Sequence, residues 1–355
     1  MALDAENKVI SIGKRTVGKG KPCFIVAEAG VNHNGSFELA RELVDVAAGA
    51  GCDAIKFQTF KTERVCSPLA PKANYQLQTT EAEESQLEMI RRLELPFDAF
   101  RELHRYCRDR DVIFLSTPFD YESADFLDEL FVPAFKIPSG ELTNLPFLEF
   151  IAAKGRPLIV STGMATMEEV AVAVEAIRCA GNKQMVLLHC VSNYPADPSS
   201  MNLRAMQALE EAFGVAIGLS DHTVGREVAY AAVALGACVI EKHFTLSKDL
   251  PGPDHRASLE PHDLIELVKG IRKIESALGD GIKEPVVEEL NTAMVARRSL
   301  VAARFIPAGA VLTQDMVDIL RPGTGLPPKM RSQLLGRYTR HDIEAGTILR
   351  LDMLA

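Results

Sequence analysis

The stretch Ala134-Phe135-Lys136-Ile137-Pro138-Ser139-Gly140-Glu141 sets the pattern that decides the fold. It begins as a short apolar run that contains one lysine, and hydroxyl and carboxyl side chains follow where the run ends. A run of this length, bounded by turn-forming Pro and Gly, is typical of a buried strand. Its polar end indicates where a functional site would lie.

Seven other runs of this kind occur in residues 23–279, and amphipathic stretches separate them. The runs are Phe24-Ile25-Val26-Ala27, Ala54-Ile55-Lys56-Phe57, Val112-Ile113-Phe114-Leu115, Leu158-Ile159-Val160, Met185-Val186-Leu187-Leu188, Ala216-Ile217-Gly218-Leu219 and Cys238-Val239-Ile240-Glu241. Eight strands that alternate with helices predict an α/β fold, a TIM (β/α)8 barrel over residues 1–280. The main alternative is a doubly wound open sheet, which usually has fewer strands and a glycine-rich first turn that this chain lacks.

Composition limits the kinds of partner. The 355 residues are 47% hydrophobic and 25% charged, which fits one large and one small globular domain. The net charge of −9 gives no reason to expect nucleic acid or a membrane surface as partner. The seven cysteines form no Cys-x-x-Cys pair and predict buried free thiols, and no signal-like or membrane-spanning run is present. We therefore expect a cytoplasmic protein.

Three local features refine this outline. Ser36 and Thr166 stand where capping boxes would begin helices. Residues 59–96 are longer than a strand-to-helix connection needs, and they would lie over the barrel mouth as a lid. Residues 281–296 are predicted to be a linker, and residues 297–355 a small β-rich domain with an internal repeat of 306–312 at 343–349.

Two lysines lie inside the predicted strands. Burying Lys56 or Lys136 is costly unless each ammonium meets an anion. Because the ends of barrel strands converge, hydroxyls of Thr117, Ser139, Ser161 and Ser220 can join the lysines in a phosphate-binding site. Each lysine can instead pair with a buried carboxylate and hold strands together, or form a Schiff base.

Histidines and carboxylates supply the other candidates. His222 and His243 end adjacent strands and can reach one divalent metal ion, or can be ordinary hydrogen-bonded residues. Spacing leaves three other histidines open as ligands: His33, His189 and His255. Glu28 and Glu141 can act as general acid or base, bind sugar hydroxyls, or belong to structural ion pairs.

Eight motifs, in this order, resemble those of the sialic acid (nonulosonic acid) synthase family over nearly the whole chain. They are Ala27-Glu28-Ala29-Gly30-Val31-Asn32-His33-Asn34-Gly35, Lys56-Phe57-Gln58-Thr59-Phe60, Ser116-Thr117-Pro118-Phe119, Phe135-Lys136-Ile137-Pro138-Ser139-Gly140-Glu141, Ser161-Thr162-Gly163-Met164, Gly218-Leu219-Ser220-Asp221-His222-Thr223, Glu241-Lys242-His243-Phe244-Thr245 and Gly252-Pro253-Asp254-His255.

The resemblance implies a TIM barrel followed by an antifreeze-like (SAF) domain, in a domain-swapped homodimer. It implies condensation of phosphoenolpyruvate (PEP) with the open-chain aldehyde of an N-acetylated mannosamine-type sugar, with release of phosphate. The enzyme would be a transferase that uses Mn²⁺, with Mg²⁺ or Co²⁺ as alternatives. The chain would act in polysaccharide biosynthesis. Two alternatives are another PEP-dependent sugar-acid synthase and an inactive barrel that serves as a binding module in polysaccharide assembly.

The resemblance also assigns residues by position. PEP would contact Lys56, Gln58, Thr117, Lys136, Ser139, Ser161, Ser192 and Ser220. The metal would sit on His222 and His243, and the sugar on Glu28, Glu141, Tyr194, Asp254 and Arg321 of the partner chain. The catalytic group would be Glu28, Lys56, Lys136, Glu141, His222 and His243.

Some positions differ from the bacterial N-acetylneuraminate synthases. Phe60 stands where those enzymes have a histidine, Arg297-Arg298 replaces an aromatic pair, and Ser192-Asn193 leaves two candidates for one PEP contact. With these differences, the chain is more similar to the N,N'-diacetyllegionaminate synthases. The favoured substrate is therefore a 2,4-diacetamido-6-deoxy sugar, with N-acetylmannosamine close behind.

Overall fold

The computed structural model describes residues 9–81 and 83–355. The chain divides into two compact units, and the boundary along the sequence lies between Gly279 and Asp280. The first unit is built on eight parallel strands in the order β5-β4-β3-β10-β9-β8-β7-β6. The strands are β3 (Phe24–Gly30), β4 (Ala54–Thr59), β5 (Ile113–Pro118), β6 (Phe135–Ile137), β7 (Leu158–Ser161), β8 (Met185–Cys190), β9 (Ala216–Asp221) and β10 (Val239–His243). β5 and β6 pack at the seam and nearly close the barrel, which confirms the predicted TIM barrel and rules out the doubly wound sheet.

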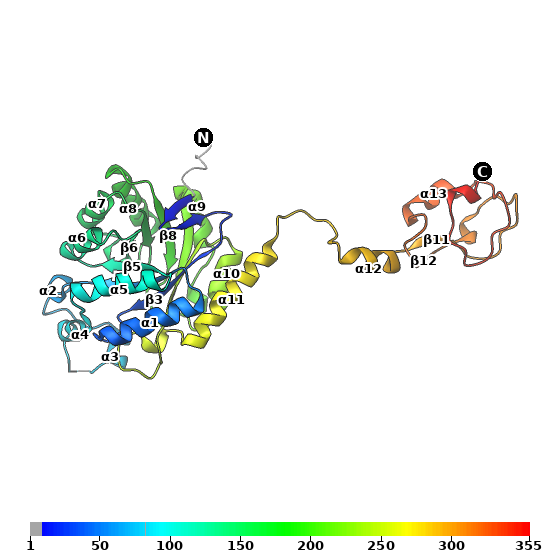
Figure 1. The fold of residues 1–355 in the computed structure, drawn as a ribbon. Helices are drawn as coiled ribbons and strands as arrows, with labels where there is room; N and C mark the ends of the chain where they lie inside the picture. Colours follow the sequence, from blue (N-terminus) through cyan, green and yellow to red (C-terminus); the bar gives the residue numbers. More distant parts are fainter. Residues whose placement is uncertain (1–8, 82) are drawn as a thin grey trace. The chain divides into compact units, whose positions relative to one another are not determined.

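Helices cover the outside of the strands (Figure 1). They are α1 (Phe37–Ala50), α5 (Phe97–Asp109), α6 (Tyr121–Glu129), α7 (Leu145–Ala152), α8 (Met167–Cys179), α9 (Ala205–Phe213), α10 (Glu227–Ala234) and α11 (Pro261–Leu278), with short 3₁₀ turns at η2 (Ser139–Glu141), η3 (Pro198–Ser200) and η4 (His255–Ala257). Thr166 forms the predicted capping box with Glu169. Ser36 caps α1 through the backbone N–H of Leu39, but the predicted box is wrong because a leucine stands at its third position.

A hairpin of β1 (Val9–Ile12) and β2 (Arg15–Gly18) packs against the amino-terminal part of the barrel. Ile10, Ile12 and Val17 are buried in one cluster with inward-facing residues near the starts of the strands, such as Phe24 and Ala54. The sequence pattern did not predict this hairpin. It fills the amino end with apolar side chains and leaves the carboxyl end for polar residues.

The long insertion after β4 contains α2 (Thr62–Val65), α3 (Asn74–Thr79) and α4 (Gln86–Leu93). In Figure 1 these helices lie at the end of the barrel unit opposite the dark blue hairpin. That is the end to which the strands run, so the insertion lies where the sequence predicted it, at the barrel mouth.

The second unit has a small core of its own, which includes Leu300, Ile306, Leu334 and Leu349. Its elements are α12 (Glu289–Ala296), β11 (Ser299–Ala302), η5 (Gln314–Met316), β12 (Val317–Leu320), η6 (Pro328–Met330), α13 (Arg331–Leu334) and η7 (Leu351–Met353). β11 and β12 pair antiparallel. α12 lies within the segment that the sequence predicted as a linker.

The sequence repeat has a structural counterpart in this second unit. Ile306 and Ile343, the first residues of the two copies, face each other in an antiparallel bridge. Gly309 and Gly346, at matching positions, have φ values of 77° and 82°, in the left-handed region that favours glycine. The two copies therefore share the same turn.

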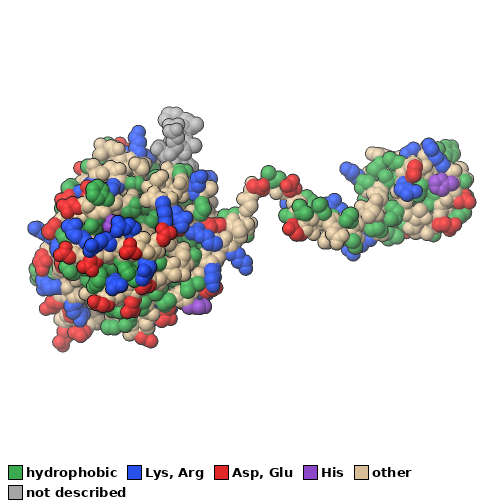
Figure 2. Space-filling model, viewed as in Figure 1, with side chains coloured by type: hydrophobic (Ala, Val, Ile, Leu, Met, Phe, Trp, Pro, Cys, Tyr) green, Lys and Arg blue, Asp and Glu red, His purple; other side chains and the backbone are tan. Residues whose placement is uncertain are grey.

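Side chains of both charge signs alternate over the face of the barrel unit drawn in Figure 2. Among the described residues, none of the helices is both long enough and apolar enough to cross a membrane.

Candidate active site

A cavity of about 410 Å³ opens at the carboxyl end of the barrel. Most of the residues predicted from the sequence line it: Glu28, Lys56, Gln58, Thr117, Lys136, Ser139, Ser161, Ser192, Tyr194, Ser220, His222, His243 and Asp254. Of the two candidates for one PEP contact, Ser192 lies in the lining, whereas Asn193 is exposed and is not a lining residue. Glu141 is not among the lining residues, and Arg321 belongs to the second unit.

The alternation of side chains along each strand explains which of the predicted residues face the cavity. Successive side chains of a strand point to opposite faces. On β10, Glu241 and His243 therefore face the cavity, whereas Lys242 points away and pairs with Asp221 of β9 at 2.7 Å. The strand register then sets inward-facing residues side by side, with Glu28 opposite Lys56 on one strand and His243 on the other.

Lys56 is the most fully paired cation in the cavity. Its Nζ lies 2.7 Å from Oε2 of Glu28 and 3.6 Å from Oε2 of Glu241, and it donates a hydrogen bond of 3.0 Å to Oγ1 of Thr117. Burial lowers the pKa of Lys56, but the two carboxylates outweigh burial and the pKa rises. Lys56 therefore carries its charge at neutral pH.

Lys136 has weaker compensation. Its Nζ donates to Oγ of Ser161 at 2.7 Å and lies 3.4 Å from Oε1 of Glu241. Burial exceeds the attraction of Glu241, so the pKa of Lys136 falls below its ordinary value. A bound anion would supply the missing negative charge and restore the pKa.

The pKa values of the two carboxyl groups, Glu241 and Glu28, shift in opposite directions. Burial raises the pKa of Glu241, but Lys136 and Lys56 outweigh burial and lower it, so Glu241 is ionised. Burial, with the help of the Glu241 carboxylate, raises the pKa of Glu28 although Lys56 opposes this. The two lysines thus face Glu241, which is ionised, and Glu28, which holds its proton more tightly. The positive charge of the lysines is therefore not fully neutralised, which favours an anionic ligand.

A glycine keeps space open beside Lys136. A Cβ atom on Gly163 would lie 2.3 Å from Oγ of Ser192 and 2.7 Å from Oγ of Ser139, so both hydroxyls would have to move to make room for it. The N–H of Gly163 donates to Oγ of Ser139 at 3.0 Å. The hydroxyls of two loops therefore meet over this glycine and offer several hydrogen-bonding groups to a ligand held by the lysine.

His222 and His243 form an imidazole pair at the edge of the cavity. Their ring centroids are 5.4 Å apart. Nδ1 of His222 lies 2.8 Å from the carbonyl oxygen of Val191, which assigns a proton to Nδ1, so in the neutral form of this ring Nε2 is the acceptor. Nδ1 of His243 is buried without a hydrogen-bond partner among the described residues. Burial, reinforced by His222, lowers the pKa of His243 well below its ordinary value, so this ring is neutral.

Aromatic rings connect the histidines to the insertion. The ring of Tyr194 lies 4.1 Å from that of His222 and 5.1 Å from that of Tyr75 on α3, centroid to centroid. Burial raises the pKa of Asp254, which also lines this side, to about 6. The cavity therefore runs from the lysines, past the histidines and Tyr194, to the insertion.

Several predicted residues lie elsewhere. The Glu141 side chain accepts a hydrogen bond of 2.7 Å from Asn144. None of the other three candidate histidines, His33, His189 and His255, lines the cavity. The ring of His189 binds the carbonyl of Met201. The ring of His255 binds the side chains of Thr245 and Asn34. Of the five candidate metal-ligating histidines, only His222, directly after β9, and His243, at the end of β10, line the cavity with the lysines.

Glu241 and Cys190 line the cavity and contact predicted site residues, but neither was assigned to the site from the sequence. Glu241 received no role, although a carboxylate inside an apolar run needs a partner for the same reason that Lys56 does. Cys190 counted only as a buried thiol, yet its Sγ lies 3.8 Å from Nδ1 of His222. All seven cysteines are free as predicted, but Cys66 is only partly buried and Cys179 is exposed.

Comparisons with known proteins agree with this geometry. The NeuB family model matches residues 43–283 and the SAF domain model matches residues 297–355. The N,N'-diacetyllegionaminic acid synthase of Campylobacter jejuni is 46% identical over 93% of this chain and 99% of its own length. The enzyme of the same name from Legionella pneumophila is 45% identical over 98% of each chain.

A solved structure is similar as well. The N-acetylneuraminic acid synthetase of Leptospira borgpetersenii, in complex with citrate, superposes with a TM-score of 0.71 at 35% identity, over 80% of this chain and 94% of that one. With a family model that covers most of the barrel and relatives that match over nearly their whole length, the chain belongs to the NeuB family and ends in a SAF domain.

Proposed function

We propose that this enzyme condenses PEP with the open-chain aldehyde of an N-acetylated mannosamine-type sugar and water, and releases phosphate. The observation that carries the proposal is the pair of buried lysines, Lys56 and Lys136, in one cavity with the His222 and His243 pair. The relatives named as N,N'-diacetyllegionaminic acid synthases support this reaction class.

The lysine side of the cavity would hold PEP. Lys136 lacks a full counter-charge and contacts Ser161, and the hydroxyls of Ser139 and Ser192 meet beside Gly163 in the same cavity. Thr117, Gln58 and Ser220 complete the set, because they contact Lys56, Glu28 and Glu241 respectively. PEP carries a phosphate and a carboxylate, and two neighbouring ammonium groups would offset both.

The histidine pair would hold a divalent metal ion, which we propose to be Mn²⁺, with Mg²⁺ or Co²⁺ as substitutes. The unpartnered Nδ1 of His243 and the free acceptor Nε2 of His222 fit a ligand role. Within the described residues no group of three or more His, Cys, Asp and Glu side chains gathers to hold a metal. The chain would thus supply two nitrogen ligands, and water and substrate the others. A metal there would polarise the aldehyde of the sugar.

The remaining lining would orient the sugar. Tyr194 and Asp254 lie beside the histidines, and Glu28 faces both Lys56 and His243 across the strands. A sugar contact for Glu141, which is not a lining residue, stays a prediction. In the proposed reaction, carbon 3 of PEP bonds to the aldehyde carbon, water adds at carbon 2 of PEP, and the phosphate leaves with the electrons of its bond to that carbon.

Among the sugars, we favour a 2,4-diacetamido-6-deoxy hexose over N-acetylmannosamine, because two relatives at 45–46% identity bear the legionaminic name. Phosphate release from PEP with Mn²⁺, measured with each sugar in turn, tests the proposal. We expect release with at least one sugar and faster release with the diacetamido sugar. Absence of release with both would contradict the proposed reaction.

We also propose a domain-swapped homodimer in which exposed Arg321 of one chain reaches the sugar in its partner's barrel. Mixing Arg321→Ala chains with Lys56→Ala chains would place an intact Arg321 and an intact Lys56 in half of the sites of each hybrid dimer. Partial recovery of activity is expected. No recovery, with hybrid dimers demonstrated by tagged chains, would contradict the swap.

The cytoplasmic location stays a prediction.

A further inference from the structure

The insertion contributes a side of the cavity that differs in chemistry from the rest. Its lining residues include Phe60, Val65, Ile90 and Leu93, together with Tyr75 and Gln76. Among the described lining residues, none that residues 60–93 supply is charged. The charged ones all come from the strand ends and the loop that carries Asp254.

These apolar side chains form a compact wall. Phe60 and Leu93 are buried in one cluster with Val31, and Val65, Ile90 and Phe119 pack against it. The rings of Phe60 and Phe119 meet edge to face with centroids 6.3 Å apart. A hydroxyl or phosphate placed against these apolar side chains would lose water and find no polar partner among them, whereas a methyl group would gain from burial.

The position of the wall indicates which end of the sugar meets it. The aldehyde carbon must lie near both PEP and the histidines, at the lysine end of the site. From His222 the lining continues through Tyr194 to Tyr75 of the insertion. The end of the sugar remote from the aldehyde, its carbons 4 to 6, would therefore extend toward the insertion, whose apolar side chains line the same cavity.

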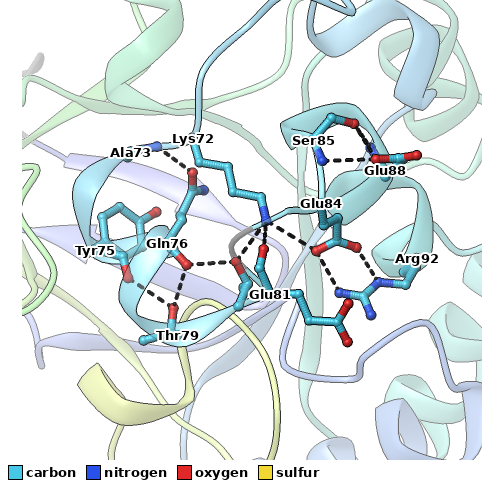
Figure 3. A network of polar contacts seen from close by, with 11 residues as sticks. Lys72, Ala73, Tyr75, Gln76, Thr79, Glu81, Glu84, Ser85, Glu88 and Arg92 are labelled. Carbon is cyan, nitrogen blue, oxygen red and sulfur yellow. Dashed lines mark hydrogen bonds and ion pairs between the residues drawn. The ribbon is translucent and has the colours of Figure 1, made fainter.

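A second feature holds the wall in shape. Lys72, whose side chain is only 2% exposed, donates hydrogen bonds to Oγ1 of Thr80 at 3.1 Å and to the carbonyl of Glu81 at 2.7 Å, and lies 3.3 Å from the Glu84 carboxylate. Glu84 in turn pairs with Arg92 of α4 at 2.7 Å. Figure 3 shows the Lys72 ammonium between these groups.

This Lys72 bracket joins the two helices that line the cavity. Lys72 lies just before α3 and binds residues just after it, and through Glu84 it reaches α4. Tyr75 and Gln76 of α3 and Ile90 and Leu93 of α4 are lining residues. Thr79 also donates to the carbonyl of Pro253, beside Asp254, at 3.3 Å. Burying an ammonium is costly, and this one satisfies three acceptors that fix both helices.

We propose that residues 60–93 are the sugar-specificity element of this enzyme, an inference that rests on the proposed function. The apolar wall receives the methyl-bearing end of a 6-deoxy, acetamido-substituted sugar and disfavours a hydroxylated or phosphorylated carbon 6. Lys72 is a positioning residue that sets the wall and does not touch PEP.

The test compares kcat/KM for the 2,4-diacetamido-6-deoxy sugar and for N-acetylmannosamine at saturating PEP and Mn²⁺. The wild-type ratio is expected to favour the deoxy sugar roughly 10- to 100-fold, the range for one apolar contact site. Ile90→Gln, at a half-buried wall position, should lower this ratio about fivefold or more. Ile90→Leu is the matched control and should keep it.

The bracket is tested with Lys72→Met, with Lys72→Arg as the conservative rescue. We expect Lys72→Met to raise the KM of the deoxy sugar about 10-fold and to lower the sugar ratio, while the Kd of PEP, measured without sugar, stays within about twofold. Lys72→Arg should restore both. Arg92→Met, at a largely exposed position, breaks the same bracket from its outer end if Lys72→Met fails to fold.

Each outcome decides one point. A wild-type enzyme that releases no phosphate with either sugar overturns the proposed function and this inference with it. Turnover with a sugar ratio that Ile90→Gln leaves unchanged overturns the apolar wall alone. An equal rise in the PEP Kd and the sugar KM in Lys72→Met shows that Lys72 serves only general stability.

Discussion

Oε1 of Glu241 lies 3.4 Å from Nζ of Lys136, and both side chains are buried between the barrel strands. The other carboxylate oxygen of Glu241 lies 3.6 Å from Nζ of Lys56. One carboxylate thus serves two ammonium groups. Lys56 also has the Glu28 carboxylate at 2.7 Å, so Lys136 has less negative charge around it in total. A site built this way stays folded without ligand and still attracts an anion.

Removing this shared carboxylate should make stability depend on PEP. Glu241→Gln leaves two buried lysines with less compensation and should lower the free energy of unfolding by about 3–5 kcal/mol. PEP would then supply the missing charge, so it should raise the melting temperature more in the variant than in the wild-type enzyme. Differential scanning fluorimetry across PEP concentrations measures both effects. Equal PEP-induced shifts in the two proteins would contradict the charge-sharing account.

Lys136 is predicted to bind PEP directly. Lys136→Met should weaken PEP binding roughly 10- to 100-fold, because a buried charge-assisted hydrogen bond contributes about 1.5–3 kcal/mol. Isothermal titration calorimetry without sugar gives the Kd. Lys242→Met is the matched control, since Lys242 is a buried strand lysine that pairs with Asp221 outside the cavity. Similar PEP affinities in the two variants would exclude a special role for Lys136.

The histidine pair is predicted to bind the metal. His222→Ala and His243→Ala should each lower Mn²⁺ affinity at least about 10-fold and lower activity with it, since each removes one of two protein ligands. Electron paramagnetic resonance of free Mn²⁺ measures the affinity. His189→Ala is the control, because that ring binds the carbonyl of Met201 and does not line the cavity. Unchanged Mn²⁺ affinity in the pair variants would refute the ligand role.

Asp254 makes stability depend on pH. Burial raises its pKa from an ordinary 3.8 to about 6. Between pH 4 and 6 the unfolded chain loses this proton while the folded chain keeps it, so the stability contributed by this carboxyl falls as pH rises and levels off above about 6. Asp254→Asn does not titrate and should gain stability relative to wild type over this range, up to roughly 3 kcal/mol at neutral pH.

Urea unfolding at pH 4.5 and at pH 7.5 checks this prediction. The difference in unfolding free energy between Asp254→Asn and the wild-type enzyme should be larger at the higher pH. An equal difference at both values would show that the carboxyl titrates normally in the folded protein.

Sequence patterns predicted the barrel because buried parallel strands are recognisable in the sequence as short apolar runs. All eight runs became strands, and the polar residue after each run marked the mouth of the barrel. The inward face was predictable too. Glu241 and His243 are two residues apart and share a face, while Lys242 lies between them and points away.

Other features needed tertiary structure. The hairpin that contains Ile10 and Val17 is too short to give a clear periodicity, and its role depends on the barrel end that it fills. Lys72 lies in an irregular stretch, and nothing local indicates that its side chain is buried against Thr80 and Glu84. Glu141 follows a strand closely, but the η2 turn (Ser139–Glu141) takes its carboxylate out of the lining.

The central claim is that one cavity joins PEP to a sugar, and the mass of the product tests it most directly. Wild-type enzyme, Mn²⁺, PEP and the 2,4-diacetamido-6-deoxy sugar should give an acid with the combined mass of sugar, PEP and water less phosphoric acid, in amounts equal to the phosphate released. Lys136→Met should form far less under the same conditions. Phosphate release without this condensed acid, or no reaction with either candidate sugar, would contradict the account.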